Sequence, residues 1–277
     1  MTFTKEELER SRLSTLAIWN AGDFGALARN FGISEAEDFV SRLELPPGVR
    51  VLDLACGTGN VTIPLARRGV SVIGLDMTPR LLEEARVRAT HEGLQLDFDQ
   101  GFVEALPYPD AAFEVVVSMF GIMFSPAPER VTEEIARVLR PAGRLAMANW
   151  TQDGFSGLMT ALVGRHLPAP PPGALSPFLW GDDETVRNRL LPHFDAVQTR
   201  VIKIKWDIPK WPVEAARFFV QNSGAVQLAL SRLSAPQRDS LLLDFTQLWV
   251  DNNSAADGME RTIIENEYLE TLAVRNE

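Results

Sequence analysis

A strand that runs straight into a glycine turn is the feature that most constrains what this chain can fold into. Residues 51–60 read VLDLACGTGN, so apolar residues lead into an acid and then into Gly57 and Gly59. This order predicts a strand, a tight turn and a helix, and such a turn lets backbone approach a ligand closely. We therefore expect an α/β sheet with a ligand site at a strand end.

Strand-like and helix-like segments alternate from residue 48 to residue 150. Thr78, Pro79 and Gly93 have the order typical of a helix between two strands: a cap, a first-turn proline and a terminal glycine. Such alternation means parallel pairing with right-handed crossovers, and it predicts a doubly wound, mainly parallel sheet. The expected strands are 49–54, 70–75, 94–99, 112–119 and 143–150, and the expected helices are 60–68, 79–92 and 128–139.

The segment before this core is helical in pattern. Capping boxes at Thr4-x-x-Glu7 and Ser34-x-x-Glu37 predict two helices, each beginning beside a polar cap. We therefore expect residues 1–47 to form an N-terminal helical cap.

Two strand-like segments follow the core, at 197–206 and 262–274, with amphipathic helices between them. We expect these strands to pair antiparallel and to complete a seven-stranded sheet. The core would then cover residues 48–150. The remainder, 151–277, would complete the sheet and carry a helical lid insertion at about 207–257.

The overall composition limits which classes of binding partner this chain is expected to have. A formal net charge of −10 argues against nucleic acid, because such binding depends on Lys and Arg contacts with phosphates. Cys56 is the single cysteine, and no apolar run approaches the roughly 18 residues of a membrane span. The first residues lack a signal-peptide pattern, and the three histidines show no metal-ligand spacing. We expect a cytoplasmic monomer or homodimer with no metal and no membrane partner.

Residues around the glycine turn narrow the class of ligand. Asp76 ends the second expected strand 19 residues after Gly57, where an acid can accept both hydroxyls of a ribose. A dinucleotide turn has a third glycine where this chain has Thr62, and Asp53 before the turn would repel a diphosphate. Asp53 suits a ligand with an ammonium group. A nicotinamide-dependent oxidoreductase shares the architecture and stays an alternative.

Together with two later motifs, these residues resemble the class I S-adenosylmethionine-dependent methyltransferases. The matching motifs are DLACGTG at 53–59, Asp76, ALPYPD at 105–110 and VLRPAGRL at 138–145. Segments 148–155 and 178–182 also resemble a bacterial small-molecule subgroup of that family. The resemblance implies a Rossmann-like methyltransferase sheet that uses S-adenosyl-L-methionine and releases S-adenosyl-L-homocysteine.

The resemblance also implies a role for each matching position. Asp53 would help to hold the amino group of the cofactor, Gly57 and Gly59 would pack against its methionine portion, and Asp76 would bind the ribose. Phe102 stands where the family usually has an acid for the adenine amino group, so stacking and backbone contacts are expected there instead. The other expected cofactor residues are Ala55, Asn60, Met77, Val103, Ser118 and Trp19.

The pocket for the methyl acceptor is expected beside the ends of the fourth and fifth strands, where this type of sheet opens its pocket. His166 is a candidate general base, with a hydrogen-bonded surface histidine as the alternative. We expect methyl transfer by in-line displacement to an O, N or C atom of a small, partly apolar molecule. A non-catalytic module that binds S-adenosylmethionine is a further alternative. The expected pocket residues are Asn20, Phe120, Met123, Phe124, Trp150 and Trp180.

Overall fold

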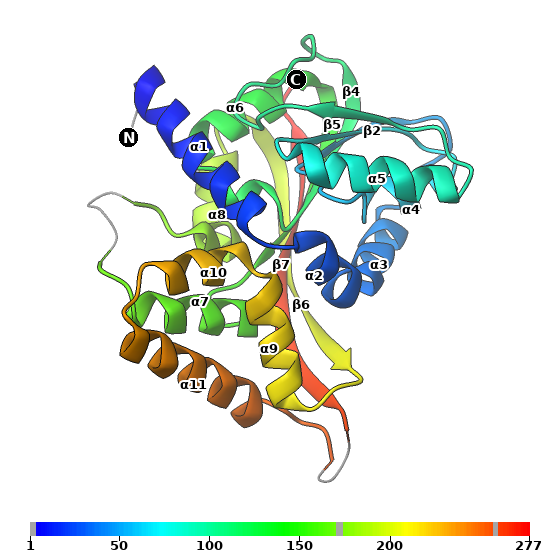
Figure 1. The fold of residues 1–277 in the computed structure, drawn as a ribbon. Helices are drawn as coiled ribbons and strands as arrows, with labels where there is room; N and C mark the ends of the chain where they lie inside the picture. The colour runs from blue at the N-terminus through cyan, green and yellow to red at the C-terminus, as the bar shows by residue number, and fades with distance from the viewer. Residues whose placement is uncertain (1–3, 170–173, 257–259) are drawn as a thin grey trace.

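The structure is a computed structural model that describes residues 4–169, 174–256 and 260–277. It contains a seven-stranded sheet in the order β3-β2-β1-β4-β5-β7-β6 (Figure 1). Strands β1 to β5 pair in parallel, whereas β7 is antiparallel to both β5 and β6, so the predicted mainly parallel seven-stranded sheet is confirmed. The strands are β1 (Arg50–Leu54), β2 (Ser71–Asp76), β3 (Asp97–Gln100), β4 (Phe113–Met119), β5 (Leu139–Trp150), β6 (Phe194–Ile208) and β7 (Thr262–Arg275).

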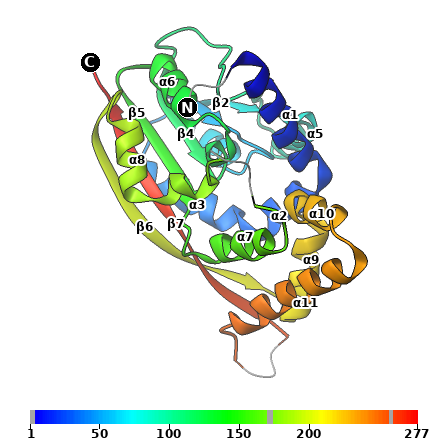
Figure 2. The same ribbon diagram turned by 90° about the vertical axis from the view of Figure 1, so that its left-hand side faces the viewer.

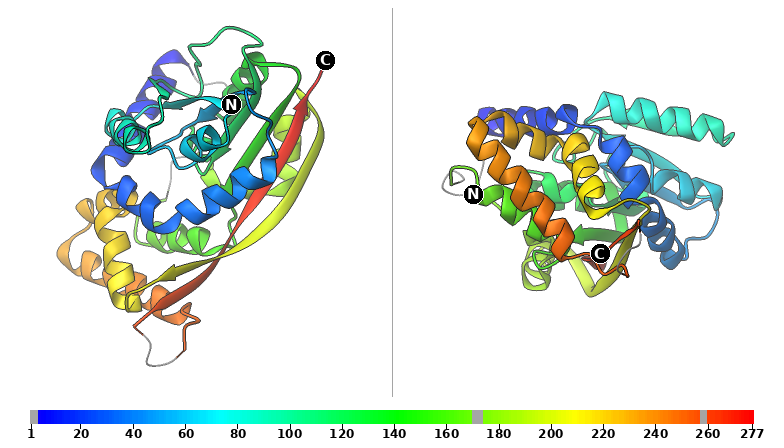
Figure 3. Two further views of the ribbon diagram at one scale, coloured as in Figure 1. Left: turned by 90° about the vertical axis from the view of Figure 1, so that its right-hand side faces the viewer. Right: turned by 60° about the horizontal axis from the view of Figure 1, so that its bottom comes forward.

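Helices cover both faces of the sheet, because successive strand residues point to opposite sides. On one face, Val51 and Val72 pack with α3 and α4, and α5 packs over Phe98 of β3 beside them. On the other face, Leu52 and Leu145 pack with α6 and α8 (Figure 3). This arrangement leaves the carboxyl ends of the parallel strands for a ligand site. The helices are α3 (Ile33–Leu43), α4 (Thr62–Arg67), α5 (Pro79–His91), α6 (Pro128–Val138) and α8 (Asp183–Leu190).

Two further helices, α1 (Lys5–Ala21) and α2 (Phe24–Phe31), precede α3. The capping box predicted at Thr4 is confirmed: its hydroxyl accepts from Glu7 N, and the Glu7 carboxylate accepts from Thr4 N. The capping box predicted at Ser34 is wrong. Gly32 alone separates α2 from α3, so α3 begins one residue before Ser34, and the Ser34 hydroxyl donates to Glu35 instead.

The antiparallel pairing predicted for the last two strands is confirmed, and a helical insertion lies between them. β6 and β7 pair from Phe194 with Arg275 to Ile208 with Thr262. Figures 1 and 2 show the inserted helices gathered beyond one end of the sheet, and their core includes Trp249. The inserted helices are α9 (Pro212–Asn222), α10 (Gly224–Ser231) and α11 (Ala235–Asp251).

One further α-helix, α7 (Phe155–Arg165), follows β5, and two short 3-10 helices, η1 (Ile122–Phe124) and η2 (Pro177–Gly181), lie in connections. Among the described helices, none is long and apolar enough to cross a membrane. Residues 4–169, 174–256 and 260–277 also contain no group of three or more His, Cys, Asp or Glu that could hold a metal ion.

Candidate functional site

The glycine turn after β1 has the backbone that the sequence predicted. Gly57 and Gly59 have φ angles of +54° and +81°, in the left-handed region that glycine adopts without strain. A Cβ at Gly57 would meet nothing within 4 Å, whereas one at Gly59 would lie 3.3 Å from Ile63. Gly57 therefore leaves space for a ligand, and Gly59 lets the turn pack against α4.

Asp53 lies beneath this turn and is 1% exposed. The Thr62 hydroxyl donates a hydrogen bond to Asp53 Oδ2 at 2.6 Å. Burial, together with the nearby charge of Asp76, raises the pKa of Asp53 to about 7, although the Thr62 bond favours the ionised form. A buried carboxylate of this kind is stabilised by a cation, so Asp53 fits a ligand that carries an ammonium group.

Asp76 connects the end of β2 to the glycine turn. Its Oδ2 accepts from Gly57 N at 2.9 Å and its Oδ1 accepts from Thr78 N at 2.8 Å. Each oxygen of a carboxylate has two lone pairs, so both can still accept a ligand hydroxyl. The residues present therefore fit an aminoacyl nucleoside such as S-adenosylmethionine, with its ribose on Asp76 and its amino group near Asp53. Met77, next in the chain, is half-buried.

Hydrogen bonds tie the ends of β1, β4 and β5 together beside the turn. Ser118 Oγ donates to Leu54 O, and Phe120 N donates to Ala148 O, both at 2.8 Å. Ala55 and Phe120 have φ angles of +55° and +57°, which residues with a side chain rarely adopt. Such backbone strain clusters at functional sites, and here it marks two neighbouring strand ends.

Gly121 lets the turn after β4 pack directly against the glycine turn. A Cβ at Gly121 would lie 2.5 Å from Ala55 Cβ and 3.0 Å from Ala55 O. A larger residue would therefore move the backbone of one of the two turns. Sequence reasoning missed Gly121, although a glycine two residues after an expected strand end was a usable signal.

Aromatic rings continue from these strand ends toward the inserted helices. Phe120 stacks on Trp150, with ring centroids 3.6 Å apart and planes 7° apart. Trp150 meets Trp206 edge-on at 5.7 Å, and Tyr268 lies edge-on to Phe120 at 5.4 Å. Phe120 and Trp150 are both half-buried, so part of each residue is exposed.

Helix α1 reaches the same region through Trp19. Its ring lies 5.0 Å from the ring of Phe124, edge-on, and 4.2 Å from the ring of Phe24. The structure thus brings together an expected cofactor residue, Trp19, and an expected pocket residue, Phe124. Asn20, the next residue of α1, is exposed.

The side chain of Asn60 connects the glycine turn to two helices. Its Nδ2 donates to Ala28 O of α2 at 3.0 Å, and its Oδ1 accepts from Arg88 of α5 at 2.6 Å. Arg88 also donates to Thr58 O at 2.6 Å, so it holds two residues of the turn. Sequence reasoning missed Arg88, which lies on an ordinary amphipathic helix with no local signal.

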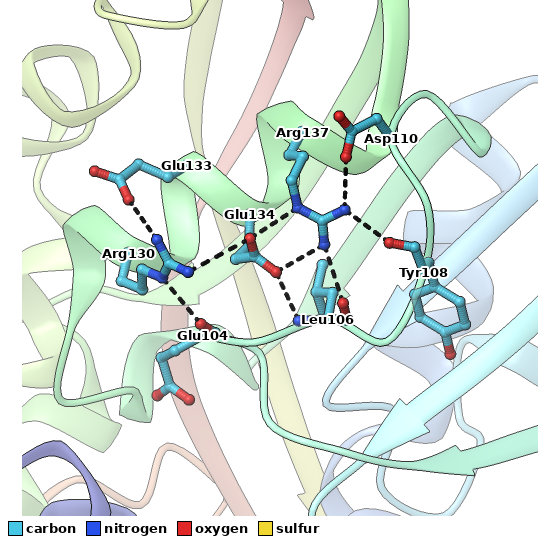
Figure 4. Close-up of polar contacts among 8 residues, drawn as sticks. All are labelled: Glu104, Leu106, Tyr108, Asp110, Arg130, Glu133, Glu134 and Arg137. Carbon is cyan, nitrogen blue, oxygen red and sulfur yellow. Dashed lines mark hydrogen bonds and ion pairs between the residues drawn. The ribbon is translucent and has the colours of Figure 1, made fainter. Parts of the chain in front are cut away.

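The loop after β3 is anchored on α6 (Figure 4). Arg137 donates to Leu106 O at 3.0 Å and to Tyr108 O at 2.7 Å, and it pairs with Glu134. Glu134 in turn accepts from Leu106 N at 2.7 Å. These contacts fix the loop that carries Phe102 and Val103, both of which are half-buried.

Three expected site residues have other neighbours. His166 follows the last residue of α7, and its Nε2 lies 2.9 Å from Asp244 Oδ2 of α11. Met123 and Trp180 are each 1% exposed within the core cluster beside α6 and α8. The Arg189 guanidinium lies 4.8 Å from the Trp180 ring centroid. The structure gives these residues packing or hydrogen-bond partners, and their roles in the reaction stay predictions.

Comparison with known proteins shows the family. Residues 51–143 match a family model described as a methyltransferase domain. The chain is 35% identical over 202 residues to uncharacterized protein Mb1438c of Mycobacterium bovis, and this alignment covers 73% of this chain and 74% of that protein. It is 37% identical over 130 residues to the demethylmenaquinone methyltransferase of Deinococcus radiodurans, covering 46% of this chain and 54% of that enzyme.

A solved structure shares the fold. Phosphoethanolamine N-methyltransferase 2 of Haemonchus contortus, in complex with phosphomonomethylethanolamine and S-adenosylhomocysteine, has a TM-score of 0.55 at 15% identity, over 88% of this chain and 53% of that chain. The methyltransferase match spans the segment with Asp53, Gly57 and Asp76, and it favours neither an oxidoreductase nor a non-catalytic module. The chain belongs to the class I S-adenosylmethionine-dependent methyltransferases.

Proposed function

We propose that this enzyme methylates an O, N or C atom of a small, partly apolar molecule by in-line displacement. The observation that carries the proposal is the stacked pair Phe120 and Trp150, at the ends of β4 and β5 beside the glycine turn. Flat apolar walls of this kind suit aromatic or apolar ligands. A formal charge of −10 disfavours nucleic acid as the acceptor.

The residues of the chain would act mainly by positioning. When bound, S-adenosylmethionine supplies a methyl group on a positively charged sulfur. Asp53 would hold the amino group and Asp76 the ribose hydroxyls, so the chain fixes the cofactor at two points. Phe120 and Trp150 would hold the acceptor and exclude water. Positioning and desolvation of this kind provide much of the rate when the leaving group is good.

The similarity to a demethylmenaquinone methyltransferase supports an acceptor of this kind, because that relative is named for a quinone. The match to this relative covers 46% of this chain and 54% of that enzyme. The acceptor proposed here is therefore a chemical class, not a single compound.

Methyl transfer from labelled S-adenosylmethionine to three separate acceptor pools tests the proposal. The pools are small phenols, quinols and aromatic amines; charged aliphatic amines; and RNA with protein. We expect labelled product from the aromatic pool. Trp150→Ala should lower that labelling at least about tenfold and leave S-adenosylhomocysteine affinity within about twofold, because Trp150 lies on the acceptor side.

Two outcomes would contradict the proposal. Labelling confined to macromolecules or to charged aliphatic amines would show a different acceptor class. A wild-type protein that binds neither S-adenosylmethionine nor S-adenosylhomocysteine in isothermal titration calorimetry would remove the cofactor as well.

A further inference from the structure

Arg12 of α1 contacts two residues of the loop after β3. Its guanidinium carbon lies 4.7 Å from the centroid of the Phe102 ring. Its Nε donates to Glu104 Oε2 at 3.3 Å, and the Ser125 hydroxyl donates to the other oxygen of Glu104. The side chains of Arg12 and Glu104 are 14% and 3% exposed, so the contact is largely shielded from water. One residue of the cap therefore holds the loop that should face the purine.

Two acids, one in β3 and one in the loop after it, have partners within the protein. Arg12 and Ser125 hold the Glu104 carboxylate, and Asp99 Oδ2 accepts from the Tyr108 hydroxyl at 2.8 Å. Figure 4 shows the Glu104 carboxylate pointing away from Arg130, which contacts the Glu104 carbonyl instead. At the place where the family usually has an acid for the adenine amino group, the side chain of Phe102 offers only an aromatic ring.

We propose that Arg12 is a positioning residue for the cofactor, which holds the Phe102 ring as a platform on which the purine stacks. The proposal rests on the proposed function, because it concerns the S-adenosylmethionine site. A guanidinium over an aromatic face attracts the ring and fixes its orientation. Phe102 is half-buried, so part of the residue is exposed.

Recognition of the purine by stacking affects which purines the site accepts. Stacking on an aromatic ring tolerates different bases, because every base has a π face. A site that reads the purine by its face should discriminate little between a 6-amino and a 6-oxo group. A site that reads the amino group with a buried acceptor should reject the 6-oxo purine strongly, because the acceptor would lose its partner.

The same contact links the cofactor to the position of the cap. Helix α1 carries Arg12 on the purine loop and Trp19 beside Phe124. It also packs closely on α10, where a Cβ at Gly224 would overlap the carbonyl of Ile18 (Figure 1). A purine on the Phe102 platform should therefore favour the position of α1 described here.

Isothermal titration calorimetry of the full chain tests the proposal with two ligands. They are S-adenosylhomocysteine and S-inosylhomocysteine, in which oxygen replaces the 6-amino group. Wild-type protein should bind them with Kd values within about threefold of each other, because stacking is common to both. Arg12→Gln and Phe102→Leu should each weaken both ligands at least about fivefold.

Two comparisons separate positioning from a general loss of structure. Combining Arg12→Gln with Phe102→Leu should cost hardly more affinity than either change alone, because both remove the same platform. Arg12→Lys keeps the cation and should restore part of the affinity. Arg10→Gln, at an exposed position of the same helix, is the matched control and should leave both Kd values unchanged.

Three results would overturn the inference. The first is a wild-type preference for S-adenosylhomocysteine of more than about tenfold, which would reveal a group that reads the amino nitrogen. The others are unchanged affinity in Arg12→Gln and fully additive losses in the double variant. The wild-type comparison needs no substitution, so it holds even if a variant fails to fold. Absence of S-adenosylhomocysteine binding to wild type would overturn the proposed function, and this inference with it.

Discussion

The Thr62 hydroxyl donates a 2.6 Å hydrogen bond to Asp53 Oδ2, and this contact gives a physical reason for the missing third glycine. A dinucleotide turn uses glycine at that position for close approach of the helix to a pyrophosphate. Here the position begins α4 with a fully buried hydroxyl that supports the acid. The turn is therefore arranged around a carboxylate that would repel a diphosphate and attract an ammonium group.

Cofactor affinity should rise with pH across the neutral range. Because the pKa of Asp53 is raised to about 7, its carboxyl group is mostly protonated at pH 6 and mostly ionised at pH 8. Only the ionised form attracts the ammonium group of the ligand. Calorimetry should show the Kd of S-adenosylhomocysteine falling by up to about tenfold between these pH values. Asp53→Asn should show no such dependence, and a flat wild-type profile would remove Asp53 from the contact.

The same carboxyl group should make the ligand-free protein less stable as the pH rises. An acid whose pKa is raised by folding binds more protons in the folded state than in the unfolded state. Its contribution to the free energy of unfolding is therefore full below pH 3.8 and is lost as the pH rises through about 7. Asp53→Asn is neutral throughout and can still accept from Thr62. Between pH 5 and pH 8, urea unfolding should show wild type losing on the order of 2 kcal/mol more stability than Asp53→Asn. Parallel profiles would show that Asp53 is not the titrating group.

The turn and its two acids could be predicted because their chemistry depends on near neighbours in the chain. Asp53 and Gly57 lie in one strand-turn segment, and Asp76 ends the next strand. The arginines that hold the turn and the loop after β3 come from distant helices: Arg88 reaches the turn from α5, and Arg12 reaches the loop after β3 from α1. No local pattern marks an arginine for such a partner, because the pairing depends on how helices dock.

The two predicted capping boxes show the same limit. Thr4 directly precedes α1, and its local pattern holds. Ser34 has an equally good pattern, but α2 ends at Phe31 and the chain turns at Gly32, so the cap falls on the glycine. Local propensity decided the first helix start, and the preceding helix decided the second.

Replacing Asp76 with alanine should weaken S-adenosylhomocysteine binding at least about tenfold. The substitution removes the acceptor for two ribose hydroxyls. It also removes the hydrogen bonds to Gly57 N and Thr78 N, so Asp76→Asn, which keeps one acceptor oxygen, should be intermediate. Asp97→Ala, at the exposed start of β3, is the control and should bind normally. Calorimetry with unchanged affinity in Asp76→Ala would exclude Asp76 from the site.

Gly121→Ala should destabilise the protein by about 1–3 kcal/mol, because the new methyl group would meet Ala55 at 2.5 Å. Gly164→Ala is the matched control. A Cβ at Gly164 of α7 would meet nothing within 4 Å. Alanine there should raise the free energy of unfolding by about 0.5–1 kcal/mol, because alanine has a higher helix propensity than glycine. Urea unfolding measures both. Equal stability of Gly121→Ala and wild type would show that the two turns separate easily.

His166→Gln should keep kcat within about threefold of wild type, whereas removal of a general base typically costs about a hundredfold or more. His166 lies 2.9 Å from Asp244 of α11, and this pairing suits a residue that braces α7 against the inserted helix. Glutamine can still donate to Asp244 but cannot take up a proton near neutral pH. His166→Ala should therefore melt at a lower temperature than His166→Gln, and Asp244→Asn should change activity as little as the glutamine variant. The measurement is kcat at saturating labelled S-adenosylmethionine. A hundredfold loss of kcat with normal cofactor affinity in His166→Gln would contradict this prediction and assign the general base to His166.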